Sequence, residues 1–221
     1  MSRCILVLGT GRSGTSAVAG TLHHLGCRMG QVFTAADRNN RWGTYEDEEF
    51  FELTRKVLAG KASPTEYKPL VVARNQQPIW GLKDPALVHV AQHLTPMLDE
   101  VRVIVARRPR HECINSFMRA YHGGRLAAEQ WYEKVVVKLA ARILEFEGAG
   151  IPILGVNFGD LLAEPLQEVS DIAYFAFKGL EQPTPRQFNA AVASVKVKPR
   201  RKLQGWGNLA IGVRIAKHPE P

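Results

Sequence analysis

Cysteine is scarce and scattered in this sequence. The 221 residues include Cys4, Cys27 and Cys113, and no two of them form a Cys-x-x-Cys pair. An odd number of widely spaced cysteines gives neither a disulfide framework nor a zinc-binding pattern, and it is typical of a reducing compartment. We therefore predict no structural disulfide, no zinc site and a cytoplasmic location.

Long apolar segments are also missing. A helix needs roughly 18 consecutive apolar residues to cross a bilayer, and no stretch of the sequence approaches that length. Met1 leads directly into a short apolar run that ends at Gly9, which is not a signal-peptide pattern. The sequence has no internal repeat and no low-complexity block. With 221 residues and 45% hydrophobic content, one globular domain with a sizeable core is expected.

Acidic residues are rare at the C-terminal end. The formal net charge is +8, and residues 196–221 hold seven Lys or Arg and one Glu, which accounts for +6 of it. Such a segment is typical of polyanion binding or of a solvated tail. Basic residues interleaved with aromatic ones are not found, so we expect no nucleic-acid partner. We predict a domain over residues 1–195 and a basic segment, 196–221, that packs on it.

Short apolar runs alternate with helical patterns along the chain. Strand-like runs cover residues 4–8, 79–82, 101–106 and 151–158, and helical spacing covers residues 13–25, 46–58, 111–121, 126–147 and 165–177. Strands that alternate with helices predict a parallel sheet with helices on both faces. The expected fold class is α/β, with three layers and a central parallel sheet of four or five strands.

The segment between the first strand and the first helix is rich in glycine and hydroxyl groups. It reads GTGRSGTS, residues 9–16. A glycine loop that leads from a parallel strand into a helix offers backbone N–H groups and the positive end of the helix dipole. The hydroxyls of Ser13, Thr15 and Ser16 and the charge of Arg12 add further donors. The loop therefore predicts a site for an anion of phosphate-like geometry.

This loop lacks the lysine of nucleotide triphosphatases. When G-x-x-x-x-G-K-[ST] is aligned from Gly9 to Ser16, the lysine position holds Thr15. Because that lysine contacts the β and γ phosphates, its absence argues against hydrolysis of ATP or GTP. Gly9, Gly11 and Gly14 match the dinucleotide pattern G-x-G-x-x-G, but no acidic residue ends a second strand about 20 residues later. Neither pattern is complete.

The motif GRSGTS resembles the loop of sulfotransferases that use 3'-phosphoadenosine 5'-phosphosulfate (PAPS). In that family the loop binds the 5'-phosphosulfate, and the resemblance implies this role for Gly11, Arg12, Ser13, Gly14, Thr15 and Ser16. A second family motif is an arginine after a later strand and a serine on the following helix, which together hold the 3'-phosphate. VRVIVARRPRHECINSF supplies Arg108 and Ser116 at the family's spacing, whereas its proline position would select Arg107 and Asn115.

Two further segments resemble the reaction centre of the same family. WGLKDPAL is similar to its Lys-Asp-Pro loop, which implies that Lys83 lies at the reaction centre. RWGTYEDEEFFELTRKVL looks like its Gly-x-x-Glu segment, which implies that Glu46 receives the proton of the acceptor. The alternative bases are histidines of the first helix and of the helix after Lys-Asp-Pro: His23, His24, His89 and His93.

Two segments complete the resemblance. ILGVNFGDLLAEP is similar to a strand and helix entry of these enzymes, in which Asp160 would brace a loop. KPRRKLQG resembles a basic loop that closes over the 3'-phosphate, which implies Arg200 or Arg201 as a ligand.

Taken together, the resemblance implies a sulfotransferase with a fold related to P-loop proteins. It would move a sulfuryl group from PAPS to a hydroxyl or amine, without a metal. The alternative is a P-loop small-molecule kinase, in which Asp84 would hold Mg²⁺. The sequence leaves three classes of acceptor: carbohydrates, lipids and small molecules. The acceptor pocket would be built from residues 28–45, 59–78 and 122–130, which match no motif that identifies a substrate.

Overall fold

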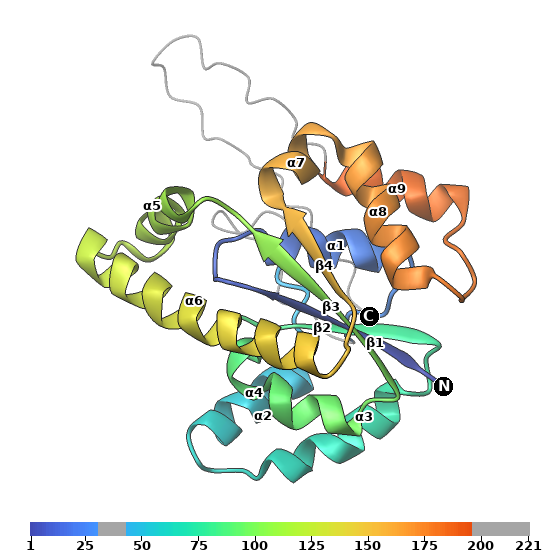
Figure 1. Ribbon diagram of the computed structural model, residues 1–221, viewed down its shortest axis with the longest axis horizontal. Helices are drawn as coiled ribbons and strands as arrows, with labels where there is room; N and C mark the ends of the chain where they lie inside the picture. The colour runs from blue at the N-terminus through green and yellow to red at the C-terminus, as the bar shows by residue number, and fades with distance from the viewer. Residues whose placement is uncertain (31–42, 196–221) are drawn as a thin grey trace, which may run out of the picture.

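The computed structural model describes residues 1–30 and 43–195. In this part of the chain, four parallel strands form one sheet in the order β2-β1-β3-β4. They are β1 (Arg3–Gly9), β2 (Ile79–Lys83), β3 (Glu100–Arg107) and β4 (Ile153–Asn157). All four arrows point toward the same end of the molecule (Figure 1). The carboxyl ends of the strands therefore share one edge of the sheet, as the sequence predicts.

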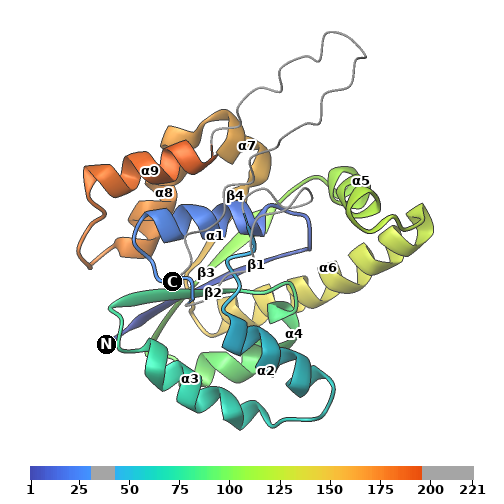
Figure 2. The same cartoon turned by 180° about the vertical axis from the view of Figure 1, so that it is seen from behind.

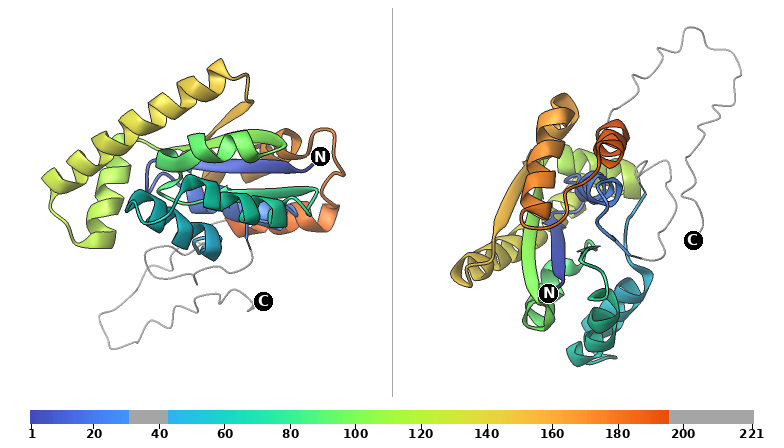
Figure 3. Two further views of the ribbon diagram at one scale, coloured as in Figure 1. Left: turned by 90° about the horizontal axis from the view of Figure 1, so that it is seen from below. Right: turned by 90° about the vertical axis from the view of Figure 1, so that its right-hand side faces the viewer.

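Helices cover both faces of this sheet (Figures 1 and 2). The first face carries α1 (Thr15–His24), α8 (Pro165–Phe177) and α9 (Pro185–Val195). The opposite face carries α2 (Glu48–Leu58), α3 (Tyr67–Arg74), α4 (Leu87–Leu94) and α6 (Arg125–Gly148). In the right-hand view of Figure 3, α1 and α9 lie above the strands and α2 and α3 lie below them. The three-layer α/β/α prediction is confirmed.

Two further helices lie at the carboxyl end of the sheet. α5 (Arg110–Tyr121) follows β3, and α7 (Phe158–Ala163) follows β4. Short 3-10 turns cover Pro64–Glu66 before α3 and Thr95–Met97 after α4. None of the helices in the described ranges is both long and apolar enough to cross a bilayer.

Strand β1 contributes to two apolar cores through its alternating side chains. Ile5 and Val7 face the layer of α1, α8 and α9, while Leu6 and Leu8 face the other layer. Every residue of β1 is buried. Burial of one such aliphatic side chain contributes about 1.5–3 kcal/mol to the free energy of unfolding. The buried side chains of β1 therefore fix the position at which the glycine loop begins.

The predicted elements agree with the structure except in short segments. Phe158, predicted as the last strand residue, begins α7 instead. Asn157, which has extended backbone angles, ends β4 and is the N-cap residue of α7. Residues 59–78 were expected to contribute to an acceptor pocket. They contain α3, whose Tyr67 and Val71 are buried in the core between the sheet and the layer of α2, α3, α4 and α6. Pro185–Val195 forms α9, which the sequence analysis did not predict.

Candidate active site

A cleft of about 520 Å³ lies at the carboxyl end of the sheet. Its walls come from the loop after β1, the segment before α2, the end of β2, and helices α5, α6 and α7. Nine of the predicted site residues line this one cleft: Gly11, Arg12, Gly14, Thr15, Ser16, Glu46, Lys83, Arg108 and Ser116. Residues distant in the sequence thus meet in a single cavity.

The glycine loop fits tightly against two aromatic side chains. Gly14 has a φ of 100° and precedes α1, and a Cβ at this position would lie 2.4 Å from Phe158 Cδ2. A Cβ at Gly11 would lie 2.6 Å from Trp131 Cζ2. Arg12 itself has a φ of 70°, which is uncommon for a residue other than glycine. Glycine is therefore required at Gly14 for both its backbone angles and its contact.

Ser13 belongs to this loop, but it is not among the residues that line the cleft. The residue is 1% exposed, and its Oγ has no hydrogen-bond partner among the described residues. Buried hydroxyl groups normally have a partner, since leaving one unpaired costs about 1–3 kcal/mol. The role of the Ser13 hydroxyl as a donor to an anion at this loop therefore stays a prediction.

Arg12 and Ser116 bring the glycine loop and α5 into direct contact. Arg12 Nε donates a hydrogen bond to Ser116 Oγ over 3.1 Å. Arg108 Nη1 donates to the Arg12 carbonyl oxygen over 3.2 Å, and Arg108 Nε pairs with Glu112 over 2.8 Å. The Arg108 guanidinium lies 4.9 Å from the centre of the Phe158 ring. The two predicted phosphate anchors are therefore adjacent.

The structure separates the two alternatives for the second anchor. Arg108 and Ser116 line the cleft. The Arg107 guanidinium instead packs over β4, where a Cβ at Gly155 would lie 3.0 Å from Arg107 Cζ. Asn115 is exposed, and neither it nor Arg107 is among the cleft-lining residues of the described chain.

Glu46 and Lys83 form a nearly buried ion pair in the same cleft. Lys83 Nζ lies 2.6 Å from Glu46 Oε1, and the side chains are 4% and 11% exposed, respectively. Lys83 is the last residue of β2, and Glu46 lies just before α2. A carboxylate and an ammonium thus stand together beside the glycine loop.

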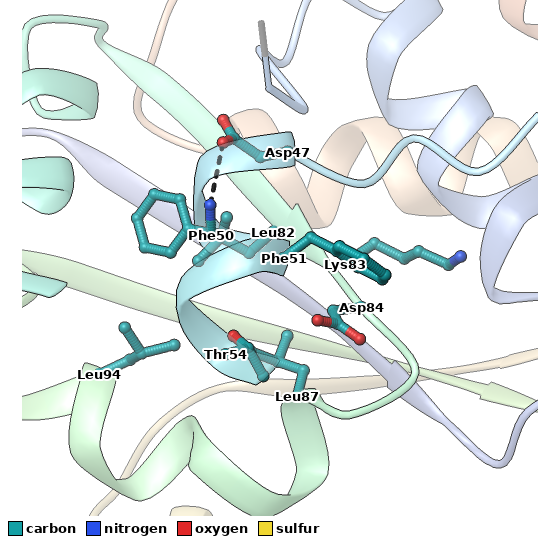
Figure 4. Close-up of a pocket in the computed structure, with 9 residues that line it drawn as sticks. All are labelled: Asp47, Phe50, Phe51, Thr54, Leu82, Lys83, Asp84, Leu87 and Leu94. Atoms are coloured by element: carbon teal, nitrogen blue, oxygen red, sulfur yellow. Dashed lines mark hydrogen bonds between the residues drawn. The ribbon is translucent and has the colours of Figure 1, made fainter. Parts of the chain in front are cut away.

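Asp84 follows Lys83 but faces away from the cleft. Figure 4 shows it beside a small cavity of about 10 Å³ between α2 and α4. Its Oδ1 accepts a hydrogen bond from the Ala86 N–H over 2.7 Å and lies 3.4 Å from Arg55 Nη2, while Oδ2 has no partner among the described residues. Burial raises the pKa of the Asp84 carboxyl.

The alternative bases lie elsewhere. None of the histidines in the described ranges lines the cleft. His23 contacts Tyr45 with ring centres 5.4 Å apart, and His89 lies on α4, where burial and the charges of Lys138 and Arg142 lower its pKa. Asp160 Oδ2 accepts a hydrogen bond from Asn157 Nδ2 over 3.0 Å, consistent with the bracing role expected of it. Arg200 and Arg201 lie outside the described residues.

Sequence reasoning missed an aromatic wall of the cleft. Phe117 stacks against Trp131 with centres 4.4 Å apart and contacts Tyr121 at 4.7 Å, and all three line the cavity. Trp131 comes from α6, and no motif singles it out. Phe51 and Arg55 of α2 form another part of the wall, with the Arg55 guanidinium 4.1 Å from the centre of the Phe51 ring.

Comparison with known proteins relates the chain to others through its structure. No protein-family model matches the sequence, and no curated protein sequence does. The sulfotransferase domain of the Synechococcus PCC 7002 olefin synthase superposes with a TM-score of 0.57 at 18% identity, covering 86% of this chain and 77% of that one. The sulfotransferase domain from the curacin biosynthetic pathway gives 0.54 at 16% identity, with 89% and 84% covered.

A third structure agrees with these two. Sulfotransferase STF1 of Mycobacterium tuberculosis gives a TM-score of 0.51 at 16% identity and covers 86% of this chain and 71% of that one. The family resemblance seen in the sequence motifs is thus confirmed at the level of architecture. The chain has the fold of sulfotransferase domains.

Proposed function

We propose that this protein is a sulfotransferase that moves a sulfuryl group from PAPS to a hydroxyl or amine of an acceptor. The observation that carries the proposal is the meeting of two anion anchors and an acid–ammonium pair in one cleft. Arg12 is bonded to Ser116, and Lys83 is paired with Glu46. The fold shared with sulfotransferase domains supports the same reading.

The arrangement of the anchors fits a nucleotide with phosphates on both sides of one ribose. PAPS carries a 5'-phosphosulfate and a 3'-phosphate on one ribose, so the protein groups that bind these two phosphates must lie close together. The 3.1 Å bond between Arg12 and Ser116, with Arg108 held on the Arg12 carbonyl, meets that requirement. The first-turn N–H groups of α1 add donors on the loop side.

The cleft holds positively charged groups that would assist transfer of the sulfuryl group. When bound, PAPS supplies an activated sulfuryl group on a phosphate leaving group, and by analogy with phosphoryl transfer an in-line displacement gathers negative charge on the leaving oxygen. Arg12, Lys83 and the N-terminus of α1 lie together in the cleft and would stabilise that charge. Donors held in place in this way are worth on the order of 3 kcal/mol each.

Glu46 would take the proton of the acceptor. It is the carboxylate of the cleft that contacts Lys83, and a base so placed contributes roughly 100-fold to 10,000-fold to a rate. Phe51, Arg55 and Pro85 line the wall beyond it and would contact the acceptor, which is a carbohydrate, a lipid or a small molecule.

A kinase is the weaker alternative. Thr15 occupies the position where P-loop kinases carry the lysine that contacts the β and γ phosphates. Asp84, the candidate Mg²⁺ ligand, is turned away from the cleft and hydrogen-bonded to the Ala86 backbone. A sulfuryl group carries less charge than a terminal phosphate, so our proposal requires no metal.

The proposal is tested with PAPS labelled with ³⁵S and a panel of a sugar, a long-chain alcohol, a phenol and an amine. We expect the protein to label at least one of these, with and without a chelator. Arg12→Ala should abolish labelling, whereas Arg110→Ala, which removes an exposed arginine paired with Glu133, should retain it. Equal labelling by Arg12→Ala and the unmodified protein would refute the proposed site.

A further inference from the structure

Glu46 is held between two buried neighbours in the sequence. Tyr45 is 4% exposed and Asp47 is 3% exposed, although both belong to the short segment that enters α2. A carboxylate that must meet Lys83 at 2.6 Å needs its backbone fixed on both sides. Asp47 fixes this backbone through hydrogen bonds, and Tyr45 fixes it through packing.

Asp47 is fixed by hydrogen bonds. Its Oδ1 accepts from the Phe50 N–H over 3.4 Å and so caps the N-terminus of α2. Arg74 of α3 donates to both of its oxygens, from Nε over 2.9 Å and from Nη2 over 3.1 Å. Such a two-pronged bond between planar groups fixes orientation as well as distance. Asp47 therefore anchors the helix side of Glu46.

Tyr45 is fixed by packing, with a strained backbone. Its φ of 52° places it in the left-handed region, which a bulky side chain adopts rarely. Its ring lies against α1 at Gly20, where an added Cβ would be 2.9 Å from Cε2 and 3.2 Å from Cζ. Strained backbone of this kind persists only where the surroundings enforce it, and it gathers at functional sites.

We propose that the contact between Tyr45 and Gly20 is a positioning contact, in which the ring held against α1 turns the chain so that the Glu46 carboxylate meets Lys83. Tyr45 then acts through Glu46 and touches no reactant. The consequence for transfer rests on the proposed function, whereas the consequence for the Glu46–Lys83 pair does not.

The substitution Gly20→Ala tests this contact. One methyl group must displace the Tyr45 ring, because 2.9 Å is shorter than any normal carbon contact. Alanine is otherwise the better helix former, so the change does not weaken α1 by itself. Gly148→Ala is the matched control, since Gly148 also lies in a helix and its added Cβ would meet nothing within 4 Å.

The first readout is the coupling between Glu46 and Lys83. Glu46→Gln, Lys83→Met and the double variant give it from urea unfolding, in three backgrounds: unmodified, Gly20→Ala and Gly148→Ala. We expect Gly20→Ala to reduce the coupling to less than about half, and Gly148→Ala to leave it unchanged. An unchanged coupling in the Gly20→Ala background would overturn the proposal. Should Gly20→Ala fail to fold, Tyr45→Ala removes the ring without crowding and must show the same loss.

The second readout is transfer from labelled PAPS to the compound of the acceptor panel that the unmodified protein labels. Because the contact acts on Glu46 alone, kcat should fall about tenfold to 100-fold in Gly20→Ala while the KM for PAPS stays within about twofold. A rise in the KM for PAPS with unchanged kcat would contradict a positioning role. If the unmodified protein transfers nothing to any acceptor, the proposed function fails, and the coupling measurement still decides whether Tyr45 positions Glu46.

Discussion

Arg12, in the loop after the first strand, donates a hydrogen bond of 3.1 Å to Ser116 in the helix after the third. The two residues are 104 positions apart in the sequence. Their contact brings the two proposed anion anchors to one point at the carboxyl ends of the strands, where open α/β sheets bind their ligands. Since the two side chains hold each other, a ligand with two phosphates can engage both without a large rearrangement.

Arg108 should provide the selectivity for the 3'-phosphate. Removing one charged hydrogen-bond donor from a phosphate site costs about 1.5–3 kcal/mol, so Arg108→Ala should weaken adenosine 3',5'-bisphosphate about tenfold to 100-fold. Binding of adenosine 5'-monophosphate should change far less, because it lacks the 3'-phosphate. Calorimetric titration of both nucleotides measures the difference.

The control for this prediction is the neighbouring arginine. Arg107 packs over Gly155 on β4, so Arg107→Ala should alter neither affinity by more than about twofold. If Arg107→Ala proved the damaging change and Arg108→Ala the silent one, the assignment of the second anchor would be reversed.

Glu46→Gln should separate chemistry from donor binding. Glutamine keeps an oxygen that accepts from Lys83 but is not a base, so the rate of transfer should fall about 100-fold to 10,000-fold. The affinity for adenosine 3',5'-bisphosphate should stay within about twofold of the unmodified protein, because the anchors are untouched. The exposed neighbour Glu48 offers the control Glu48→Gln, which should transfer at the normal rate. Transfer by Glu46→Gln at that same rate would remove Glu46 from the mechanism.

Gly14→Ala should damage stability and the loop together. The left-handed backbone costs alanine about 1–2 kcal/mol, and the 2.4 Å approach to Phe158 adds about 1–3 kcal/mol of overpacking. Gly150→Ala is matched to it, with a φ of 68° and nothing within 4 Å, so it should lose only the backbone part. Urea unfolding of both variants compares the two losses, and equal losses would show that Phe158 does not crowd the loop.

Asp84 should make stability fall as pH rises above the unfolded-state pKa of about 3.9. Burial raises its pKa in the folded protein, whereas the unfolded value is about 3.9. Between these two values the folded state binds more protons than the unfolded state, so the free energy of unfolding decreases with pH. Asp84→Asn replaces the ionisable carboxyl with a neutral amide, so no buried charge forms at high pH. The variant should be more stable than the unmodified protein at pH 7, with the difference shrinking below about pH 4. Urea unfolding from pH 3 to pH 7 tests this, and a difference that grows toward acid would contradict it.

The sequence was sufficient to predict most of the fold because periodicity reports on burial. β1 and β3 read as strands since their side chains are buried on both faces of a covered sheet, and α1 and α8 read as helices from apolar spacing. Phe158 was assigned to the wrong element because an apolar aromatic residue after a strand looks like its continuation. The helix within residues 59–78 was not predicted, because α3 is short and follows a 3-10 turn.

Motifs located the polar residues of the cleft but not its aromatic wall. Arg12 and Arg108 follow strands and Lys83 is the last residue of one, so their approach could be anticipated from parallel strands that end at one edge of the sheet. Trp131 lies within a long helix and reaches Gly11 only through tertiary packing, which no local pattern encodes. The choice between Arg107 and Arg108 also depended on the neighbouring strand, since Gly155 of β4 provides the space that Arg107 occupies.

The central claim is that one adenosine nucleotide with phosphates at both its 3' and 5' positions occupies this cleft. Calorimetric titration of the unmodified protein with adenosine 3',5'-bisphosphate, and separately with ATP and Mg²⁺, tests it most directly. We predict that the bisphosphate binds without metal and at least about tenfold more tightly than ATP with Mg²⁺. Tighter binding of ATP with Mg²⁺, or no binding of the bisphosphate, would contradict the account.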